Sequence, residues 1–385
     1  MPIKNRIADL QPEIAAWRRD LHQHPEILFD THRTAAFVAE KLRAFGCDDV
    51  VTGIGRTGVV GVIRGRMAGP AIGLRADMDA LPILEETGAE YASKIPGAMH
   101  ACGHDGHTAM LLGAAQYLAE TRDFAGTAVV IFQPAEEGGG GGREMCADGM
   151  MDRWQIAEVY GMHNWPGLPL GAFAIRSGAF FAATDQFDIT IHGRGGHAAK
   201  PHETIDPTVT ASQIVLALQT IASRNVDPVR QVVVSVTSFE TSSTAFNVIP
   251  ASVRLKGTVR TLDDDTRAMA EKRIRALVDG LVTGMGAQAE VTYHHGYPVM
   301  VNTPAETAFA ADVARAVSGD CGEAPLVMGG EDFAFMLQER PGAYIVVGNG
   351  DSAGLHHPAY DFNDAAITAG TSYWVELIER RLPVS

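Results

Sequence analysis

Apolar positions in the first part of the chain follow a helical spacing. Ile14, Trp17 and Leu21 recur among charged residues, and a second apolar set follows between residues 36 and 42. His24-Pro25 separates the two sets, and the residue before a proline disfavours helical backbone. The pattern therefore predicts two helices between residues 12 and 45.

Short apolar runs of the kind that form buried strands come next. Helical segments separate several of these runs, and the clearest is 106–121, which is rich in Ala, Leu and Met. This alternation predicts an α/β fold with a mostly parallel sheet. The predicted strands are 58–64, 71–76, 127–133, 157–162 and 343–348.

The stretch from about 184 to 293 has a different order: strand, helix, strand, strand, helix, strand. This β-α-β-β-α-β order is typical of a ferredoxin-like α+β unit. We therefore expect one domain formed by 1–182 and 294–385, with a second domain, 183–293, inserted into it. The elements expected in the insert are 184–193, 206–224, 231–240, 251–260, 264–284 and 288–293.

The composition is that of an ordinary soluble globular protein, with 46% hydrophobic and 20% charged residues in a chain of 385. The net charge of −15 opposes nucleic acid or an anionic membrane as a partner, because both attract positive surfaces. The sequence shows no signal peptide and no apolar run long enough to span a bilayer. Its four cysteines are few and far apart, which predicts reduced thiols in the cytoplasm.

Metal-competent side chains gather directly after the predicted strands, where open α/β sheets place their ligands. One further group opens the predicted helix 106–121. These groups are Asp77 and Asp79 after 71–76, Glu136 and Glu137 after 127–133, His163 after 157–162, His356 and His357 beyond 343–348, and Cys102-Gly103-His104 before the helix.

The pair Cys102 and His104 is the most informative of these groups. A helix N-terminus and a metal each lower the pKa of a thiol, and Gly103 permits a tight turn that aims both side chains at one point. The alternative is an inert buried cysteine, and the pair alone does not decide between the two. The neighbouring groups favour a metal ligand.

Glu136 and Glu137 have two interpretations as well. One carboxylate can bind a metal while the other, pointing elsewhere, activates water as a general base. The alternative is a solvated acidic turn, but Pro134 before the pair and Gly138–Gly142 after it favour a turn built for backbone geometry. The glycine run does not predict a phosphate loop, because no Gly-Lys-Ser/Thr follows.

The number of candidate ligands separates a catalytic from a structural metal site. A structural zinc site is closed by four ligands, whereas this set offers one Cys, one Glu and three His, which suits two ions. The thiolate favours zinc, while manganese, cobalt and nickel also fit His and carboxylate ligands. The histidines that we assign to surface or purely hydrogen-bonded positions are His22, His24, His32, His192 and His294.

Seven segments together resemble the M20 metallopeptidase family, in its hippurate hydrolase and N-acyl-L-amino acid amidohydrolase branch. The resemblance covers nearly the whole chain. It implies a zinc-peptidase-type catalytic domain, an inserted lid and dimerisation domain, two divalent metal ions, and a homodimer or a dimer of dimers. The segments are MHACGHDGH, QPAEEGGGG, GMHNWP, GRGGHAAKPH, NVIP, GGEDF and LHHPAYDFND.

The resemblance also implies roles for single residues. It makes Cys102 the ligand that bridges two metals, with His104 and His163 completing one metal and Glu137 and His356 the other, and it leaves Glu136 as general base. His357 is the alternative to His356. The wider family has a His-x-Asp motif where this chain has Arg75-Ala-Asp77, so Asp77 is expected only to orient a ligand.

In the lid, the resemblance makes His197 a residue that reaches the active site of a partner subunit and stabilises the oxyanion. It makes Asn247 and Arg260 a substrate-binding pair. Arg260 could hold the substrate carboxylate with two hydrogen bonds, although a surface strand position is the alternative.

The function expected from these residues is hydrolysis of an N-acyl amino acid to a carboxylic acid and a free amino acid. One alternative is a dipeptidase or aminopeptidase of the same family. Another is a binding or redox-sensing protein without catalysis, in which Cys102 is an oxidisable thiol. The sequence does not select the acyl group or the amino acid.

Overall fold

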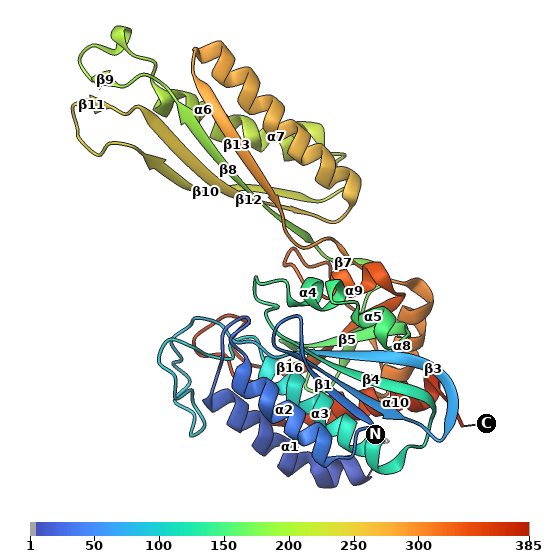
Figure 1. Ribbon diagram of the computed structural model, residues 1–385. Helices are drawn as coiled ribbons and strands as arrows, with labels where there is room; N and C mark the ends of the chain where they lie inside the picture. Colours follow the sequence, from blue (N-terminus) through green and yellow to red (C-terminus); the bar gives the residue numbers. More distant parts are fainter. Residues whose placement is uncertain (1–4, 385) are drawn as a thin grey trace. The chain divides into compact units, whose positions relative to one another are not determined.

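The computed structural model describes residues 5–384 and divides into two compact units (Figure 1). Unit 1 comprises Met1–Gly178, Val301–Pro325 and Asp332–Ser385, and unit 2 comprises Ala179–Met300 and Leu326–Glu331. The insert expected from the sequence, 183–293, lies inside unit 2. Residues 1–4 and 385 of the expected catalytic domain lie outside the described residues.

Unit 1 is built on an eight-stranded sheet with the order β1-β2-β4-β3-β5-β16-β6-β15. The four central strands, β4, β3, β5 and β16, are parallel, whereas β1 and β2 pair antiparallel at one edge. The mostly parallel sheet predicted from the sequence is therefore confirmed. The strands are β1 Asp49–Ile54, β2 Gly58–Arg64, β3 Met67–Asp77, β4 Ala125–Gln133, β5 Ile156–Pro166, β6 Phe173–Ile175, β15 Gly322–Glu323 and β16 Gly342–Gly350.

All five strands predicted for this sheet are present, because their apolar residues are buried on both faces. In β4 and β16 nearly every residue is buried, as expected for strands covered by helices on both sides. β1 was not predicted, because its exposed edge position leaves it without a continuous apolar run. Two further short strands, β7 Gly178–Phe181 and β14 Met300–Asn302, lie where the chain passes between the units.

Helices cover this sheet on both sides: Figure 1 shows α1, α2 and α3 on one side of the strands and α4, α5 and α9 on the other. α3 is buried over most of its length and packs against α1 and α10. Its buried residues belong to one continuous apolar core with Ile14 of α1 and Trp374 of α10. The helices are α1 Asn5–Gln23, α2 His32–Ala44, α3 His104–Thr121, α4 Gly141–Ala147, α5 Met150–Arg153, α8 Pro304–Ser318, α9 Ala334–Glu339 and α10 Ile367–Arg381, with a 3-10 turn at Asp364–Ala366.

Unit 2 is an antiparallel four-stranded sheet with the order β10-β12-β8-β13, covered by two helices. This is the strand order of the ferredoxin-like fold that the β-α-β-β-α-β pattern predicts. Phe187, Ile214 and Ile274 form its own core, separate from that of unit 1. Its elements are β8 Ala183–His192, β9 Gly196–His197, a 3-10 turn Pro201–Glu203, α6 Pro207–Thr220, a π-helical turn Ile221–Asn225, β10 Val232–Thr241, β11 Val248–Ile249, β12 Ser252–Thr261, α7 Asp264–Met285 and β13 Gln288–His295.

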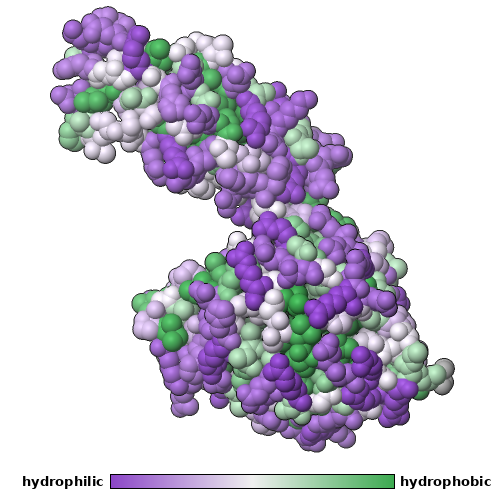
Figure 2. All heavy atoms as spheres, in the orientation of Figure 1, coloured by the Kyte–Doolittle hydropathy of each residue, from purple (hydrophilic) through white to green (hydrophobic). Residues whose placement is uncertain are grey.

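The visible face of each unit is largely hydrophilic, with smaller apolar patches (Figure 2). None of the helices in the described part of the chain is long and apolar enough to cross a lipid bilayer.

Candidate metal centre

The carboxyl ends of the parallel strands in unit 1 converge on one group of polar side chains. β3 ends at Asp77, β4 ends just before Glu136, and β5 carries His163 near its end. Carboxyl ends of parallel strands meet at one edge of a sheet, which is why segments far apart in the sequence come together here. The loop after β16 joins them, because the His356 N–H donates to the carbonyl of Ala101 (2.8 Å).

The five sequence-predicted ligands form two groups that share one residue. Cys102, His104 and His163 form one group, and Cys102, Glu137 and His356 form the other. Within each group the ligand atoms lie within 4.8 Å of one another. Cys102 Sγ lies 3.3 Å from His163 Nε2, and His356 Nε2 lies 3.3 Å from Glu137 Oε1. A cation in each group would therefore share the thiolate of Cys102.

Gly103 makes the turn that aims Cys102 and His104 at this centre. Its φ of +84° lies in the left-handed region, where only glycine is free of strain. A Cβ at this position would lie 2.3 Å from Asn164 Nδ2 and 2.4 Å from the Tyr360 hydroxyl. The turn thus needs glycine both for its backbone angle and for the close packing around it.

Two other residues beside the ligands also have left-handed backbone. Ala135, which precedes Glu136, has φ +53°, and His356 has φ +64°. Such angles cost a residue with a side chain on the order of 1 kcal/mol, and they persist where surrounding contacts enforce them. Strained backbone therefore occurs in two of the segments that carry candidate ligands.

Hydrogen bonds to ring nitrogens show which histidines can bind a metal. His163 Nδ1 lies 2.6 Å from the Asn164 carbonyl; a carbonyl only accepts, so Nδ1 carries the proton and Nε2 presents its lone pair to Cys102. His107, in contrast, uses both nitrogens, donating to Asp77 (2.6 Å) and accepting from Asn164 (2.9 Å). His357 Nδ1 accepts from the Ala359 N–H (3.0 Å), and His357 belongs to none of the groups found among the described residues.

The hydrogen bonding of His104 indicates that the residues of this centre fit a metal ion. Its ring is fully buried, yet neither nitrogen makes a hydrogen bond with any described residue. Glu137 Oε1, another buried atom of this centre, also makes none. Buried polar atoms are almost always satisfied, so unsatisfied nitrogen and oxygen beside a thiol are the donor set that a divalent cation would complete.

The electrostatics of the centre favour positive charge. Burial lowers the pKa of His104, but the charges of Asp77 and Asp79 raise it further, to about 10. Burial and the charge of Glu137 raise the pKa of the Cys102 thiol well above its ordinary value. This is opposite to the lowering expected from the helix N-terminus, because burial and the nearby carboxylates outweigh the dipole. A bound cation would reverse that balance.

Asp77 lies among the ligands, but its carboxylate is bound by other groups. Arg75, fully buried, donates to one oxygen (2.7 Å), and His107 donates to the other (2.6 Å). Arg75 also donates to Gln133 (2.9 Å) and Asp332 (3.0 Å). His104 Nε2 lies 3.7 Å from Asp77, and Asp77, His104 and His107 form a further group whose ligand atoms lie within 4.8 Å of one another. Both oxygens of Asp77 already accept hydrogen bonds from Arg75 and His107.

Several residues that had no role predicted from the sequence hold the segments of the candidate ligands in place. Asn164 donates to the Cys102 carbonyl (2.6 Å) and accepts from the Tyr360 hydroxyl (2.7 Å). Asp79, whose pKa is raised by burial, accepts the N–H groups of Glu136 and Glu137. Their place at strand ends was visible in the sequence, but their partners are distant in the chain.

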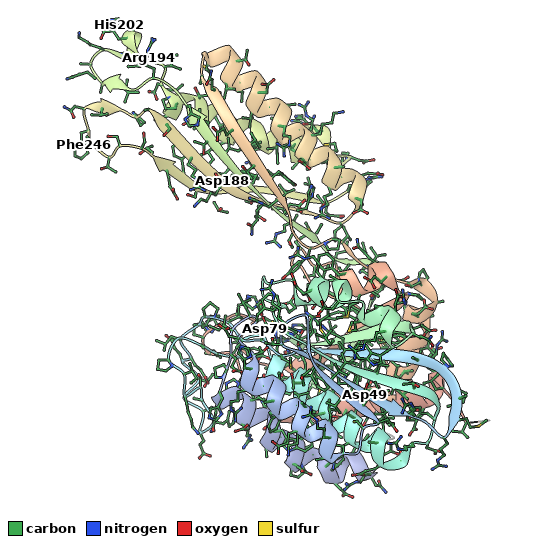
Figure 3. The ribbon with its side chains drawn as sticks, in the orientation of Figure 1. Asp49, Asp79, Asp188, Arg194, His202 and Phe246 are labelled. Carbon is green, nitrogen blue, oxygen red and sulfur yellow. The ribbon has the colours of Figure 1, made fainter. Side chains whose placement is uncertain are left out.

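The lid residues expected from the sequence lie in unit 2. His197 and Val248 pair across the two-stranded sheet β9-β11, so Asn247 lies beside His197. Both His197 and Asn247 are exposed. His197 Nδ1 accepts the Ala199 N–H (3.1 Å), which leaves Nε2 as the nitrogen with the proton. Figure 3 labels Arg194, His202 and Phe246 at this same end of unit 2.

Arg260 is half-buried on β12, where its Nε donates to Thr258 (3.2 Å). The structure shows how far apart Asn247 and Arg260, the pair expected to bind substrate, lie within one chain. β12 begins at Ser252, close to Asn247 in the chain, and Arg260 lies eight residues farther along. An extended strand of that length covers about 26 Å, so the two side chains of one chain cannot both contact one small molecule.

Comparison with known proteins adds an independent finding. The model of peptidase family M20/M25/M40 matches residues 73–380. An N-acetyl-L-cysteine deacetylase of Bacillus subtilis is 40% identical over 98% of this chain and 90% of its own length. A hippurate hydrolase of Campylobacter jejuni is 41% identical over 96% of this chain and 97% of its own length. The crystal structure of a dinuclear metal-binding M20 peptidase from Bacillus subtilis is 35% identical and superposes with a TM-score of 0.86, covering 97% of this chain and 99% of that chain.

Proposed function

The chain belongs to peptidase family M20/M25/M40, and we propose that this metal-dependent amidohydrolase cleaves the amide bond of N-acyl amino acids to a carboxylic acid and a free amino acid. The observation that carries the proposal is the pair of ligand groups joined at Cys102, with Glu136 buried beside them. The names of the relatives, a deacetylase and a hippurate hydrolase, support the same substrate class.

The ligands we propose are Cys102, His104 and His163 for one ion and Cys102, Glu137 and His356 for the other. When bound, two divalent cations would polarise the acyl carbonyl and lower the pKa of a water molecule. The thiolate favours zinc, and manganese, cobalt or nickel would also suit the His and Glu ligands. Arg75 and His107 already bind Asp77, so we give Asp77 the role of orienting its neighbours.

Side chains of the protein then carry out proton transfer, stabilise the oxyanion and bind the substrate. Glu136 takes the proton from the attacking water and delivers it to the leaving amine, so that the C–N bond breaks as the carboxylic acid forms. His197 donates from Nε2 to the oxyanion of the tetrahedral species. Asn247 and Arg260 hold the substrate, with the guanidinium of Arg260 pairing with the free carboxylate.

We further propose that the enzyme works as a homodimer or a dimer of dimers. His197 and Asn247 are exposed at one end of unit 2, and Arg260 lies about 26 Å away along β12. One substrate molecule can meet all three only if they come from two copies of the chain. We place the protein in the cytoplasm, since its four cysteines are free thiols, as a reducing compartment keeps them.

The test is release of free amine from N-benzoyl and N-acetyl amino acids by metal-loaded protein. Dipeptides with a free amino group serve as the comparison, because a dipeptidase or aminopeptidase would prefer them. We expect turnover of the acylated substrates, its loss after treatment with a chelator, and its recovery on adding Zn²⁺ or Mn²⁺. Preference for dipeptides, or activity that survives complete removal of metal, would overturn the proposal.

A further inference from the structure

Asp79 makes an unusual set of contacts just beyond the end of β3 (Figure 3). One carboxylate oxygen accepts the N–H of Glu136 (2.9 Å), and the other accepts the N–H of Glu137 (3.1 Å). A single side chain therefore holds the backbone of both the proposed base and the neighbouring proposed ligand. Once both N–H groups are held, the backbone there is fixed, and so are the directions in which the two side chains leave it.

The same carboxylate faces a second proposed ligand. His104 Nδ1 lies 3.5 Å from Asp79 Oδ1, while His104 Nε2 is turned towards Glu137 Oε1 (3.9 Å). Metal-binding histidines commonly have their other ring nitrogen next to a carboxylate, which fixes the orientation of the ring. Asp79 is therefore placed to hold the imidazole with Nε2 directed at the centre.

The alternative is a purely structural role, in which Asp79 only caps a turn. Glu26 provides the comparison, since its carboxylate accepts the N–H groups of Arg33 (2.9 Å) and Thr34 (2.8 Å) at the start of α2 in the same way. Glu26, however, is partly exposed, whereas Asp79 is 1% exposed and lies near the carboxylate of Glu137. A buried charge in such surroundings is unfavourable unless a positive partner is near, and a plain cap needs no charge.

The backbone next to Glu136 also needs restraint. Ala135 has φ +53°, and its carbonyl accepts the N–H of Gly141 (3.1 Å). Left-handed backbone at a residue with a side chain persists only where neighbouring contacts hold it. The two hydrogen bonds to Asp79 follow directly after this strained residue.

We propose that Asp79 is a positioning residue that fixes Glu136 and Glu137 relative to each other and orients His104 toward the metals. The inference rests on the proposed function, in which Glu136 is the base and Glu137 and His104 are ligands. Asp79 touches no substrate in this scheme. It acts through the backbone of the first pair and through the ring of His104.

The experiment compares Asp79→Asn with Glu26→Gln in the full-length protein. Each variant removes one carboxylate that accepts two consecutive backbone N–H groups, but only Asp79 faces the centre. The readouts are Zn²⁺ affinity by competition with a chromogenic chelator, kcat and KM on an N-acyl amino acid, and thermal unfolding. Asp79→Glu, which keeps the charge and both acceptor oxygens, is the third variant.

We expect Asp79→Asn to weaken Zn²⁺ binding about 10- to 100-fold and to lower kcat by a similar factor, with KM changed less than about threefold. Glu26→Gln should lower the unfolding temperature while its Zn²⁺ affinity and kcat stay at the parent values. Asp79→Glu should bind Zn²⁺ more tightly than Asp79→Asn, because it restores the charge, while its kcat stays low because the longer side chain displaces Glu136.

Parent-like Zn²⁺ affinity and kcat in Asp79→Asn would overturn the inference. So would equal losses in Glu26→Gln, since they would show a general effect of destabilisation. Zn²⁺ affinity is measured without substrate, so it tests the role of Asp79 even if the parent protein shows no amidohydrolase activity. A parent protein without that activity would count against the proposed function alone.

Discussion

Glu136 and Glu137 are neighbours in the sequence, yet their surroundings give them different chemistry. Burial raises the pKa of Glu137, but the neighbouring imidazole of His356, whose Nε2 lies 3.3 Å from Oε1, and the charge of His104 lower it below its ordinary value. Its carboxylate is thus ready to bind a cation. Glu136 is also buried and lies near His104, but it belongs to neither group that contains Cys102, which suits a general base.

The first prediction concerns Glu136→Gln. This variant should bind as much metal as the parent, because no ligand is lost, while kcat falls by about 10² to 10⁴ through loss of the base. Metal analysis and steady-state kinetics on the same preparation check both parts. Glu144→Gln, at a partly exposed position of α4, is the control with parent-like kcat. Near-normal turnover in Glu136→Gln would show that Glu136 is not the general base.

The second prediction concerns Cys102→Ala. Because Cys102 belongs to both ligand groups, its loss should weaken binding of both ions and abolish turnover. Cys146→Ala is a matched control, since Cys146 is 8% exposed and Cys102 is 7% exposed, yet Cys146 is absent from every ligand group found in the described residues. Two ions bound to Cys102→Ala as tightly as to the parent would show that the thiolate is not the bridge.

At the scale of elements, short turns set the geometry of the centre. α3 begins at His104 immediately after Gly103, so the turn decides where both neighbouring ligands point. The third prediction is that Gly103→Ala destabilises the protein by about 3 kcal/mol, from left-handed strain plus steric overlap, and weakens metal binding.

Urea unfolding and metal analysis measure these effects. Gly88→Ala separates the two causes, because Gly88 also has a positive φ (+67°) but has no atoms within 4 Å of an added Cβ. It should lose only about 1 kcal/mol and keep its metal. Equal losses of stability and metal in the two variants would mean that the packing of Gly103 against Asn164 has no special role.

α1 is tied to the start of α3 by buried charges. Arg18, which is fully buried, lies 2.8 Å from Asp105, and His22 Nδ1 lies 2.8 Å from the same carboxylate. Asp105 directly follows His104. This network therefore supports the segment that carries a proposed ligand, and the assignment of His22 to a hydrogen-bonded position agrees with these contacts.

The fourth prediction follows from His22. Burial lowers its pKa, but the charge of Asp105 and hydrogen bonds with Asp105 and Glu85 raise it further, to about 9, from an ordinary value of 6.5. Protonated His22 therefore stabilises the folded state fully below pH 6.5, and this contribution is lost as the pH rises through about 9. The stability advantage of the parent over His22→Gln should shrink by roughly 3 kcal/mol across that range.

Urea unfolding of metal-stripped protein at several pH values measures this difference without interference from metal binding. Arg18 remains charged throughout and should contribute equally at each pH. A stability difference that stays constant, or grows, between pH 6.5 and 9 would contradict the assigned protonation of His22.

At the scale of the whole molecule, the fifth prediction concerns cooperation between copies. His197→Ala and Glu136→Gln should each be nearly inactive alone. If His197 acts on the site of another copy, each mixed dimer regains one complete site, and random mixing of the two variants restores about a quarter of parental activity. Co-expression with two different affinity tags and a rate assay checks this. If purified mixed dimers recover no activity, His197 acts only on the active site of its own chain.

The sequence by itself determined the architecture, because the signals are local. Apolar runs and helical spacing gave the five predicted strands of unit 1 and the strand order of unit 2. The types of residue after the strands gave the candidate ligands. Edge strand β1 could not be predicted from apolar runs, since this exposed strand has no continuous apolar run.

Only the tertiary structure decided which candidates meet and what holds them. It placed Cys102 in two ligand groups, bound Asp77 to Arg75, and separated Asn247 from Arg260 along β12. These facts depend on contacts between segments that are far apart in the chain. Local patterns fix which faces of strands and helices are buried, but the partners of a buried carboxylate or imidazole are set only when the strands pack side by side.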